Sequence, residues 1–332
     1  RIYLYIRECI IFFLRESFLE KEYASYKNIN VTELHTFSKN STPVYWYQST
    51  SDKTQKKIVG GKNGFGFKLV LIWSSYGKIE TVDHIRGLKY TQEFENNLDT
   101  IKPPIIEKCN KKPYTKVTFK PDYARLKING LTADMINLFK RRVYDIAAIT
   151  NKNIKVNYNG SLVPIKSFQH YVDLYIGSKT ETTRVYEEAN ERWEYVVCLA
   201  TKEEFTQVSF VNGIYTVKGG KHVDYILNQI VRKIVAYIKN KKKIEVKPNT
   251  IKEQLMLFVR CDIENPTFDS QTKDYMNTPS NKFGSTCNVS DNFIEKIAKM
   301  GVMEIACALT EVKATNAVKK TDGSKTKNIR GI

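Results

Sequence analysis

The chain has 332 residues, of which 42% are apolar, and its formal net charge is +18. At roughly 150 residues per domain, this length suggests two domains, and the apolar share excludes a disordered tail. Lys and Arg outnumber Asp and Glu by 53 to 35, an excess that favours nucleic acid, nucleotide phosphates or an acidic membrane surface as partners. A low-GC genome would also enrich Lys, together with Asn, Ile and Tyr, so charge alone leaves the function open.

The six cysteines are widely spaced without a CxxC pair, and the four histidines are scattered. Disulfide frameworks and zinc sites need clustered ligands, so we expect reduced thiols in an intracellular protein and assign no metal ligand. The apolar stretch 2–14 is interrupted by Arg7 and Glu8 and is shorter than the ~20 residues that span a bilayer. We therefore expect no membrane segment and no signal peptide. The first residue is Arg rather than Met, which suggests a fragment.

Hydrophobic periodicity and turn residues predict the elements in chain order. The first half is expected to contain a helical stretch to about Ser25, a glycine-rich loop followed by an apolar helix over 58–73, strands at 78–83, 88–94 and 115–120, an amphipathic helix at 131–150, and a hairpin at 156–163. Asn159-Gly160 lies between two apolar runs, and this dipeptide favours the positive φ angles of a two-residue hairpin turn.

A domain boundary is expected near Pro164. After it the sequence predicts a short helix at 168–176, strands of an antiparallel sheet at 184–188, 193–200 and 207–217, a long helix at 223–239, a basic loop at 239–243, a strand at 255–263, a polar loop at 262–284, a helix from Ser290 to about Val318, and a basic tail. The pair Gly219-Gly220 is expected to break the chain before the long helix.

The glycine-rich loop reads Gly60-Gly-Lys-Asn-Gly-Phe-Gly-Phe-Lys68. Its four glycines allow a close approach of the backbone to a ligand, and the N-terminus of the following helix favours an anion. Lys62 and Lys68 add positive charge. The loop is not a P-loop, because no Ser or Thr follows Lys68. The residues by themselves fit a phosphate cradle and a plain tight turn equally well.

The polar loop contains Glu264-Asn-Pro-Thr-Phe-Asp-Ser-Gln-Thr-Lys273, and Phe283-Gly-Ser-Thr286 follows. Pro266 restricts the backbone, and Ser270, Gln271 and Thr272 are suited to an ordered loop. Lys273 could be presented to a phosphate as a point charge. A solvated surface loop would fit these residues as well.

Together, these segments resemble the GHKL ATPases, in the form found in eukaryotic-type type IIA DNA topoisomerases. The glycine-rich loop is similar to the ATP lid, and Gln271-Thr272-Lys273 resembles the QTK loop of the transducer domain. The resemblance covers about residues 49–332 in the family's order. It includes 141–146, 171–175, 208–212, 218–225, and the tail 319–331, which resembles the lysine-rich segment leading towards the TOPRIM domain.

The resemblance implies an α+β fold, with a partial GHKL (Bergerat-type) α/β sandwich followed by a transducer domain whose β-sheet packs on helices. The implied division is an atypical segment at 1–48, the C-terminal part of the GHKL domain at 49–163, the transducer at 164–318 and a basic linker at 319–332.

ATP and Mg²⁺ are the implied cofactors. Lys273 would contact the γ-phosphate, and loss of that contact on hydrolysis would let the two domains rotate. The implied ATP contacts are Ser49, Thr50, Gly61, Lys62, Asn63, Gly64, Phe65, Gly66, Phe67, Lys68, Gln271, Thr272 and Lys273.

The implied partners are double-stranded DNA and a second copy of the chain in an ATP-dependent dimer, and the implied location is the nucleus. Lysines that face phosphates bind without sequence preference and with strong salt dependence. The implied DNA contacts are Lys239, Asn240, Lys241, Lys242, Lys243, Lys319, Lys320, Lys325 and Lys327. For the run 239–243, a solvated helix end is also open.

Two parts of the family's ATP site have no match in the sequence. None of Glu16, Glu20 and Glu22 has an Asn four residues later, and no Asp-x-Gly-x-Gly segment exists. The general base for hydrolysis is therefore unassigned, and we expect weak nucleotide binding and weak or absent hydrolysis. The TOPRIM acidic cluster and the cleavage-tyrosine domain are also absent, so this chain alone is not expected to cut DNA.

The favoured interpretation is the ATP-binding and transducer portion of an ATP-hydrolysing type II DNA topoisomerase, which controls DNA topology by double-strand passage. The alternative is a non-enzymatic DNA-binding or interaction fragment that keeps the basic transducer surface. Another GHKL enzyme, such as a chaperone or a mismatch-repair ATPase, is disfavoured by the Gln271-Thr272-Lys273 segment and the tail.

Overall fold

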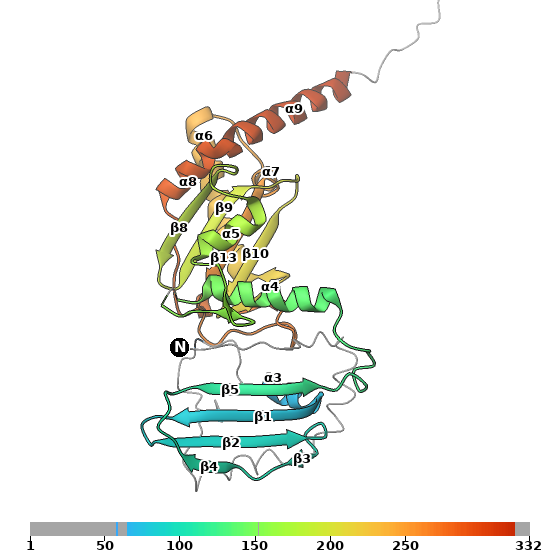
Figure 1. Cartoon of the computed structure of the whole chain (residues 1–332). Coiled ribbons are helices and arrows are strands. Elements are labelled where there is room, and N and C mark those ends of the chain that lie inside the picture. The colour runs from blue at the N-terminus through green and yellow to red at the C-terminus, as the bar shows by residue number, and fades with distance from the viewer. Residues whose placement is uncertain (1–57, 59–64, 152, 323–332) are drawn as a thin grey trace, which may run out of the picture. The chain divides into compact units, whose positions relative to one another are not determined.

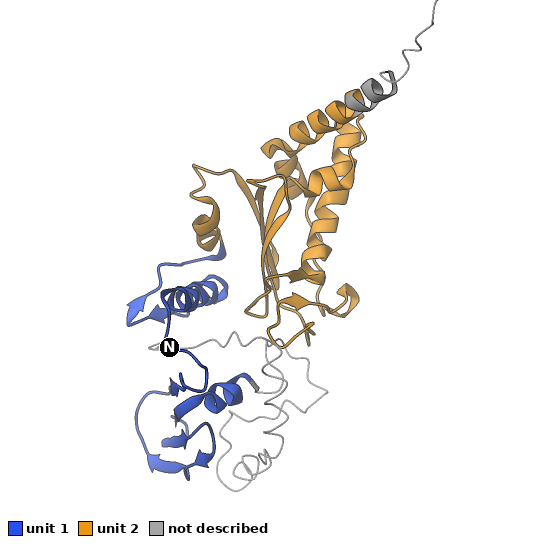
Figure 2. Ribbon diagram, turned by 90° about the vertical axis from the view of Figure 1, so that its right-hand side faces the viewer, with its two compact units in different colours: residues 1–56, 61–168 blue, residues 57–60, 169–332 orange. Residues whose placement is uncertain are grey.

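The computed structural model describes residue 58 and residues 65–151 and 153–322. The helix expected up to about Ser25 falls on residues 1–57, which lie outside this part. The described residues form two compact units, 65–168 and 169–322 (Figure 2); the sequence places the boundary nearby, at Pro164. None of the helices in these ranges is long and apolar enough to cross a membrane.

The first unit contains a five-stranded antiparallel sheet (Figure 1). Its strands are β1 (Ser74–Asp83), β2 (Leu88–Glu95), β3 (Thr100–Ile101), β4 (Ile105–Lys108) and β5 (Thr115–Pro121). β1 pairs with β2 and β5, and β2 also pairs with β3 and β4. The three longer strands confirm the sequence prediction, whereas β3 and β4 are too short to show an alternating pattern.

The two faces of this sheet differ in chemistry. On one face, Ile79 and Phe94 are buried and form a core with Leu71 of α3 (Phe65–Ile72), the apolar helix that was predicted after the glycine-rich loop. On the other face, charged side chains pair across strands, for example Lys102 with Glu95 at 2.5 Å. This alternation is typical of an antiparallel sheet with one face packed and one face solvated.

The first unit also holds a helix and a small hairpin. α4 (Ala133–Ile149) confirms the predicted amphipathic helix, and Thr132 caps it by accepting a hydrogen bond from Met135 N at 3.3 Å. β6 (Asn157–Tyr158) pairs with β7 (Ser161–Leu162). The turn residues Asn159 and Gly160 have φ angles of 49° and 83°, which confirms the hairpin prediction and agrees with a type I′ turn.

The second unit is built on a mixed five-stranded sheet in the order β11-β10-β13-β9-β8. The strands are β8 (Arg184–Asn190), β9 (Trp193–Leu199), β10 (Thr206–Val211), β11 (Ile214–Tyr215) and β13 (Leu255–Cys261). Of the three strands expected to form an antiparallel sheet, β8 and β9 pair in that way. The sequence prediction gave no orientation for β13, which lies between β9 and β10 and pairs in parallel with β10. The reason is that α6 (Lys221–Lys242) lies between them in the chain, as in a crossover connection. The single strand expected at 207–217 is broken at Asn212-Gly213, where both φ angles are positive.

Helices cover both faces of this sheet. Ile226, Ile230 and Ile234 of α6 are fully buried in the core on one face, at the four-residue spacing of a single helix face. On that face Phe293 of α8 (Asp291–Ile297) stacks edge-on against Tyr195. On the opposite face, the predicted helix α5 (Phe168–Ile176) places Tyr171 5.8 Å from the ring of Phe210 and Tyr175 5.5 Å from that of Phe258.

Two helix predictions need correction, and one observed helix was not predicted. The residues expected as a basic loop form the last turn of α6 up to Lys242, and Lys243 caps the helix with a φ of 61°. The helix expected from Ser290 to about Val318 is interrupted at 298–302 by a π-type turn in which Gly301 has a φ of 117°, and α9 (Met303–Asp322) follows. A short helix, α7 (Pro248–Lys252), has no counterpart in the prediction.

His222 near the start of α6 makes the stability of the second unit depend on pH. Its side chain is fully buried, Nε2 lies 3.3 Å from Thr216 Oγ1, and Nδ1 has no partner among the described residues. Burial lowers the pKa of His222 to about 3, against about 6.5 in an unfolded chain. Between these values the unfolded state binds a proton that the folded state does not, so stability falls as the pH decreases through this window.

We therefore expect the free energy of unfolding to lose about 1.4 kcal/mol per pH unit from this group below about pH 6.5. Urea unfolding of the wild type and His222→Gln at several pH values checks this, because carboxylate contributions are common to both and cancel in the difference. The wild type should show the steeper loss, and equal slopes would contradict the assignment.

Candidate functional site

The segment that carries Gln271-Thr272-Lys273 folds back on itself as an irregular hairpin. Its arms are joined by hydrogen bonds from Glu264 N to Phe283 O (3.0 Å), from Thr267 N to Thr278 Oγ1 (2.7 Å) and from Asp269 N to Tyr275 O (3.2 Å). The segment lies at the surface, and these hydrogen bonds give it a defined backbone conformation.

The tip of this hairpin is a closed turn. Lys273 N donates to Ser270 O at 3.2 Å, and the hydroxyls of Ser270 and Thr272 lie 2.8 Å apart. Lys273 closes the turn with a φ of 61°, a left-handed conformation that is uncommon for a residue with a side chain. Gln271 is exposed and Thr272 is half-buried. The backbone thus fixes where all three residues of the segment lie.

The side chain of Lys273 lies against an aromatic ring. Its Nζ is 5.9 Å from the centre of the Phe268 ring, within the range of a cation–π interaction. Phe268 packs against the core of the second unit and forms a β-bridge with Met276. Burial lowers the pKa of Lys273, whereas the ring face favours the charged form. The ammonium group is therefore partly desolvated and held by a fixed neighbour.

The returning arm of the hairpin is joined to the start of α6. β12 (Gly219–Gly220) pairs in parallel with β14 (Tyr275–Met276). Next to this pair, Lys218 N donates to Asp274 O at 2.9 Å. Because Asp274 directly follows Lys273, the lysine is one residue away from a backbone hydrogen bond to the segment that leads into the long helix.

The base of the hairpin is held by Asn212. Its side-chain amide accepts a hydrogen bond from Ile263 N at 2.7 Å and donates one to Ile263 O at 2.8 Å. Arg192 adds an ion pair to Glu264 at 3.2 Å and a hydrogen bond to Gly284 O at 3.1 Å. Sequence reasoning missed these positioning residues, although Asn212-Gly213 is a turn signal and could have marked the first of them.

The predicted lid residues are only partly described. Ser49, Thr50, Gly61, Lys62, Asn63 and Gly64 lie outside the described residues. Phe65, Gly66, Phe67 and Lys68 form the first turn of α3, the end of a helix whose free N–H groups favour an anion. Lys68 is half-buried, and burial lowers its pKa. Lys68 belongs to the first unit and Lys273 to the second.

The lysine run at the end of α6 is only partly neutralised. Lys239 forms a 2.6 Å ion pair with Glu245, which raises the pKa of the lysine. Lys241, Lys242 and Lys243 are exposed, and within the described part of the chain none of them forms an ion pair. Asn240 is exposed beside them. Lys319 and Lys320 fall in the last turns of α9, and Lys325 and Lys327 lie outside the described residues.

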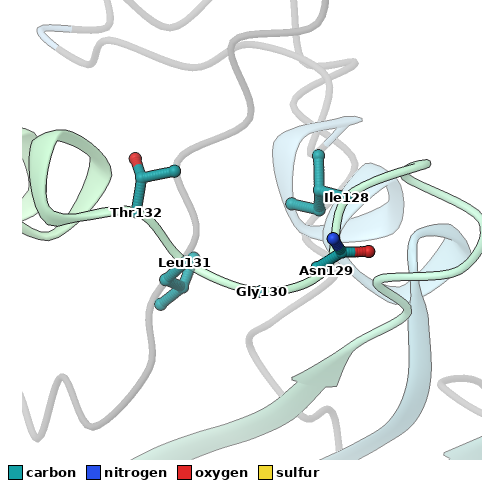
Figure 3. A pocket seen from close by; sticks show the side chains of 5 residues that line it. All are labelled: Ile128, Asn129, Gly130, Leu131 and Thr132. Atoms are coloured by element: carbon teal, nitrogen blue, oxygen red, sulfur yellow. The ribbon is translucent and has the colours of Figure 1, made fainter.

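The described residues offer no alternative catalytic centre. The loop before α4 forms a hollow lined by Ile128, Asn129, Gly130, Leu131 and Thr132 (Figure 3), and none of these side chains titrates. In the same part of the chain, no group of three or more His, Cys, Asp or Glu residues could hold a metal ion. The hairpin around Lys273 is therefore the best-defined candidate site.

Comparisons with known proteins identify relatives of this chain. A family model described as DNA gyrase B matches residues 167–327. DNA topoisomerase 2 of Arabidopsis thaliana is 45% identical over 287 residues, which cover 84% of this chain and 19% of the relative. The protein of the same name from Drosophila melanogaster is 39% identical over 291 residues, which cover 86% and 20%.

Two solved structures share the fold. The ATPase region of Saccharomyces cerevisiae topoisomerase II matches with a TM-score of 0.73 and 40% identity, over 80% of this chain and 68% of that one. The ATPase and transducer domains of DNA topoisomerase II from Balamuthia mandrillaris match with a TM-score of 0.75 and 38% identity, over 81% and 69%. The predicted α+β class and the predicted family are confirmed.

The fold is thus that of an ATPase and transducer region. The chain belongs to the family of eukaryotic type II DNA topoisomerases, and it spans about a fifth of the length of the curated relatives it matches.

Gly220 offers a test of the link between the hairpin and α6. Its φ is 147°, and a Cβ atom there would lie 2.6 Å from Met276 N and clash with Met276 O. Backbone atoms cannot move aside without opening the β12–β14 pair. We expect Gly220→Ala to cost about 3 kcal/mol of unfolding free energy and to accelerate amide hydrogen exchange at Met276.

Gly301→Ala is the matched control, because Gly301 has a φ of 117° but only a side-chain atom of Leu199, at 3.7 Å, faces its missing Cβ. It should cost about 1–2 kcal/mol and leave exchange at Met276 unchanged. An equal loss of unfolding free energy in the two variants would show that the β12–β14 pair accommodates a Cβ atom at Gly220 without much strain.

Phe268→Leu tests whether the ring holds the lysine. Leucine keeps an apolar contact but lacks the negative ring face, a contribution of about 0.5–1 kcal/mol, so the pKa of Lys273 should fall further below its ordinary value. Titration of the Lys273 side-chain ¹³C resonance, assigned with Lys273→Arg, measures this pKa.

The control is Phe205→Leu, because the Phe205 ring lies 5.5 Å from the Nζ of Lys252. It should leave the titration of Lys273 unchanged. An unchanged or raised Lys273 pKa in Phe268→Leu would rule out the ring as its support.

Proposed function

We propose that this chain is the ATP-binding and transducer portion of an enzyme that passes one DNA duplex through another at the expense of ATP. In this proposal Lys273 contacts the γ-phosphate of ATP, and Gln271 and Thr272 shape the turn that presents it. The observation that carries the proposal is the ordered hairpin tip, in which a half-buried lysine is fixed by its own backbone turn and by Phe268.

The chemistry of the tip suits a phosphate sensor. A lysine ammonium is a compact charge with three donors, and partial desolvation strengthens its attraction for an anion. Hydrolysis would remove the group it contacts, so the lysine could distinguish a triphosphate from a diphosphate. Backbone amides of Gly61 to Gly66 and Lys68 are proposed to hold the remaining phosphates, because that segment leads into the N-terminus of α3.

The finer parts of the proposal follow from the family. Mg²⁺ would accompany the nucleotide, two copies would dimerise when ATP binds, and the location would be the nucleus. Duplex DNA would contact the run from Lys239 to Lys243 and the lysines of the tail. Lys241, Lys242 and Lys243 support this best, since they are exposed and Lys239 is already paired with Glu245.

Hydrolysis by this chain is proposed to be weak or absent, since no general base is assigned to it. A non-enzymatic DNA-binding fragment is the second candidate. It is favoured because none of Glu16, Glu20 and Glu22 has an Asn four residues later and because the sequence has no Asp-x-Gly-x-Gly segment. In that case duplex binding would be salt-dependent and indifferent to nucleotide.

Lys273→Gln tests the sensor. The wild-type chain should bind a non-hydrolysable ATP analogue more tightly than ADP, because only the triphosphate reaches Lys273. The variant should lose about tenfold of this preference, the size expected for a hydrogen bond between charged groups, while its ADP affinity is unchanged. Calorimetric titration at high chain concentration measures both affinities.

Lys282→Gln is the control, because Lys282 is an exposed lysine in the 3₁₀ turn (Ser280–Lys282) of the same hairpin. It should keep the preference for the triphosphate. If the wild type shows no such preference, or if both variants behave alike, the sensor role is excluded and the non-enzymatic candidate stands.

A further inference from the structure

A second concentration of positive charge lies in the first unit, at one end of its sheet. The stretch 108–121 contains five lysines and no Asp or Glu. β4 lies at one edge of the sheet and β5 at the other (Figure 1), so the connection 109–114 crosses the end of the sheet between them. Lys108, Lys111 and Lys112 are thereby gathered at this end, and all three are exposed.

The crossing segment is fixed rather than a free loop. At its start, Cys109 N donates to Gly87 O at 2.7 Å, and at its end Tyr114 O accepts from Val82 N at 2.9 Å. Both partners flank the tight connection between β1 and β2. The lysines therefore stand on a platform held at two points, and a ligand would not have to order the backbone that carries them.

The carboxylates near this platform are already paired. Glu107 binds Lys89 at 2.9 Å, Glu80 lies 3.7 Å from Lys116, and Asp83 lies 3.5 Å from Arg86. In contrast, none of Lys108, Lys111 and Lys112 forms an ion pair within the described ranges. Their three charges are thus left uncompensated within a run of five residues.

We propose that Lys108, Lys111 and Lys112 form a second contact surface for the backbone of duplex DNA, distinct from the end of α6. Uncompensated like charges on a fixed platform repel one another, and a polyanion relieves that repulsion. Lysine suits it because an ammonium binds a phosphate without demanding a particular geometry. The choice of DNA rests on the proposed function, whereas the need for a polyanion rests on the geometry alone.

The alternative is a run of lysines that is only solvated and binds no DNA. A salt titration of DNA binding distinguishes this alternative from a contact surface. Each lysine that contacts a phosphate contributes about 0.9 to the slope of log Kobs against log salt. The triple variant Lys108→Gln, Lys111→Gln, Lys112→Gln should therefore lower that slope by two to three for a 30-base-pair duplex, as measured by fluorescence anisotropy. Its melting temperature should stay near that of the wild type, because these side chains hold nothing else.

The matched control removes the same charge elsewhere, in Lys166→Gln, Lys179→Gln, Lys202→Gln, three exposed lysines without an ion pair among the described residues. It should leave the slope unchanged. Equal slopes for the control and the platform variant would overturn the inference, and so would a larger effect on duplex RNA than on DNA.

A third variant distinguishes failure of the inference from failure of the proposed function. Lys241→Gln, Lys242→Gln, Lys243→Gln removes the exposed lysines at the end of α6. If this variant lowers the slope and the platform variant does not, the proposed function stands and the second surface is rejected. If neither lowers it more than the control, DNA binding by both surfaces is rejected.

Discussion

The position of Lys273 depends on a short pairing between two backbone segments that are far apart in the sequence. β12 and β14 each contribute two residues, yet this pair joins the hairpin to the two residues that directly precede α6. Only a residue without a side chain fits at Gly220, because Met276 backbone atoms occupy the space of a Cβ. A glycine of this kind thus serves the site without touching a ligand, which explains why a search for charged or nucleophilic residues overlooks it.

The long helix α6 both packs in the core and connects the hairpin side of the second unit to the exposed lysines. α6 supplies the buried isoleucines of the core, and it runs for 22 residues, or about 33 Å, from the hairpin side to the lysines at its other end. A packed helix transmits a displacement along its axis with little loss, since the core that holds it is not readily deformed. One element, α6, therefore connects the Lys273 end of the second unit to the Lys241–Lys243 end.

Local sequence signals predicted most of the individual helices and strands. They did not predict features that depend on pairing between segments far apart in the sequence. Asn159-Gly160 identified a hairpin because its turn geometry is decided by two residues. The parallel pairing of β10 with β13 could not be read in the same way, because it follows from the chain's return through α6. In the candidate site, the motif predicts a role for Lys273. The base of its hairpin depends on a contact between Asn212 and Ile263, 51 residues apart, which a local pattern does not reveal. The ring beside Lys273 belongs to Phe268, five residues earlier in the chain.

The net positive charge of the chain indicates a binding surface only where its lysines are not already in ion pairs with carboxylates. On the first unit's sheet, lysines such as Lys89 and Lys102 form ion pairs with glutamates on neighbouring strands. Much of the excess positive charge is therefore neutralised there. The excess reappears where the chain leaves the sheet, in a segment that has lysines and no carboxylates. The same happens at the end of α6, where one lysine is paired and the next three are not. Codon usage alone would scatter unpaired lysines over the surface, as at Lys166, Lys179 and Lys202. It is the clustering of three unpaired lysines on anchored backbone that favours a binding surface over a solvated run.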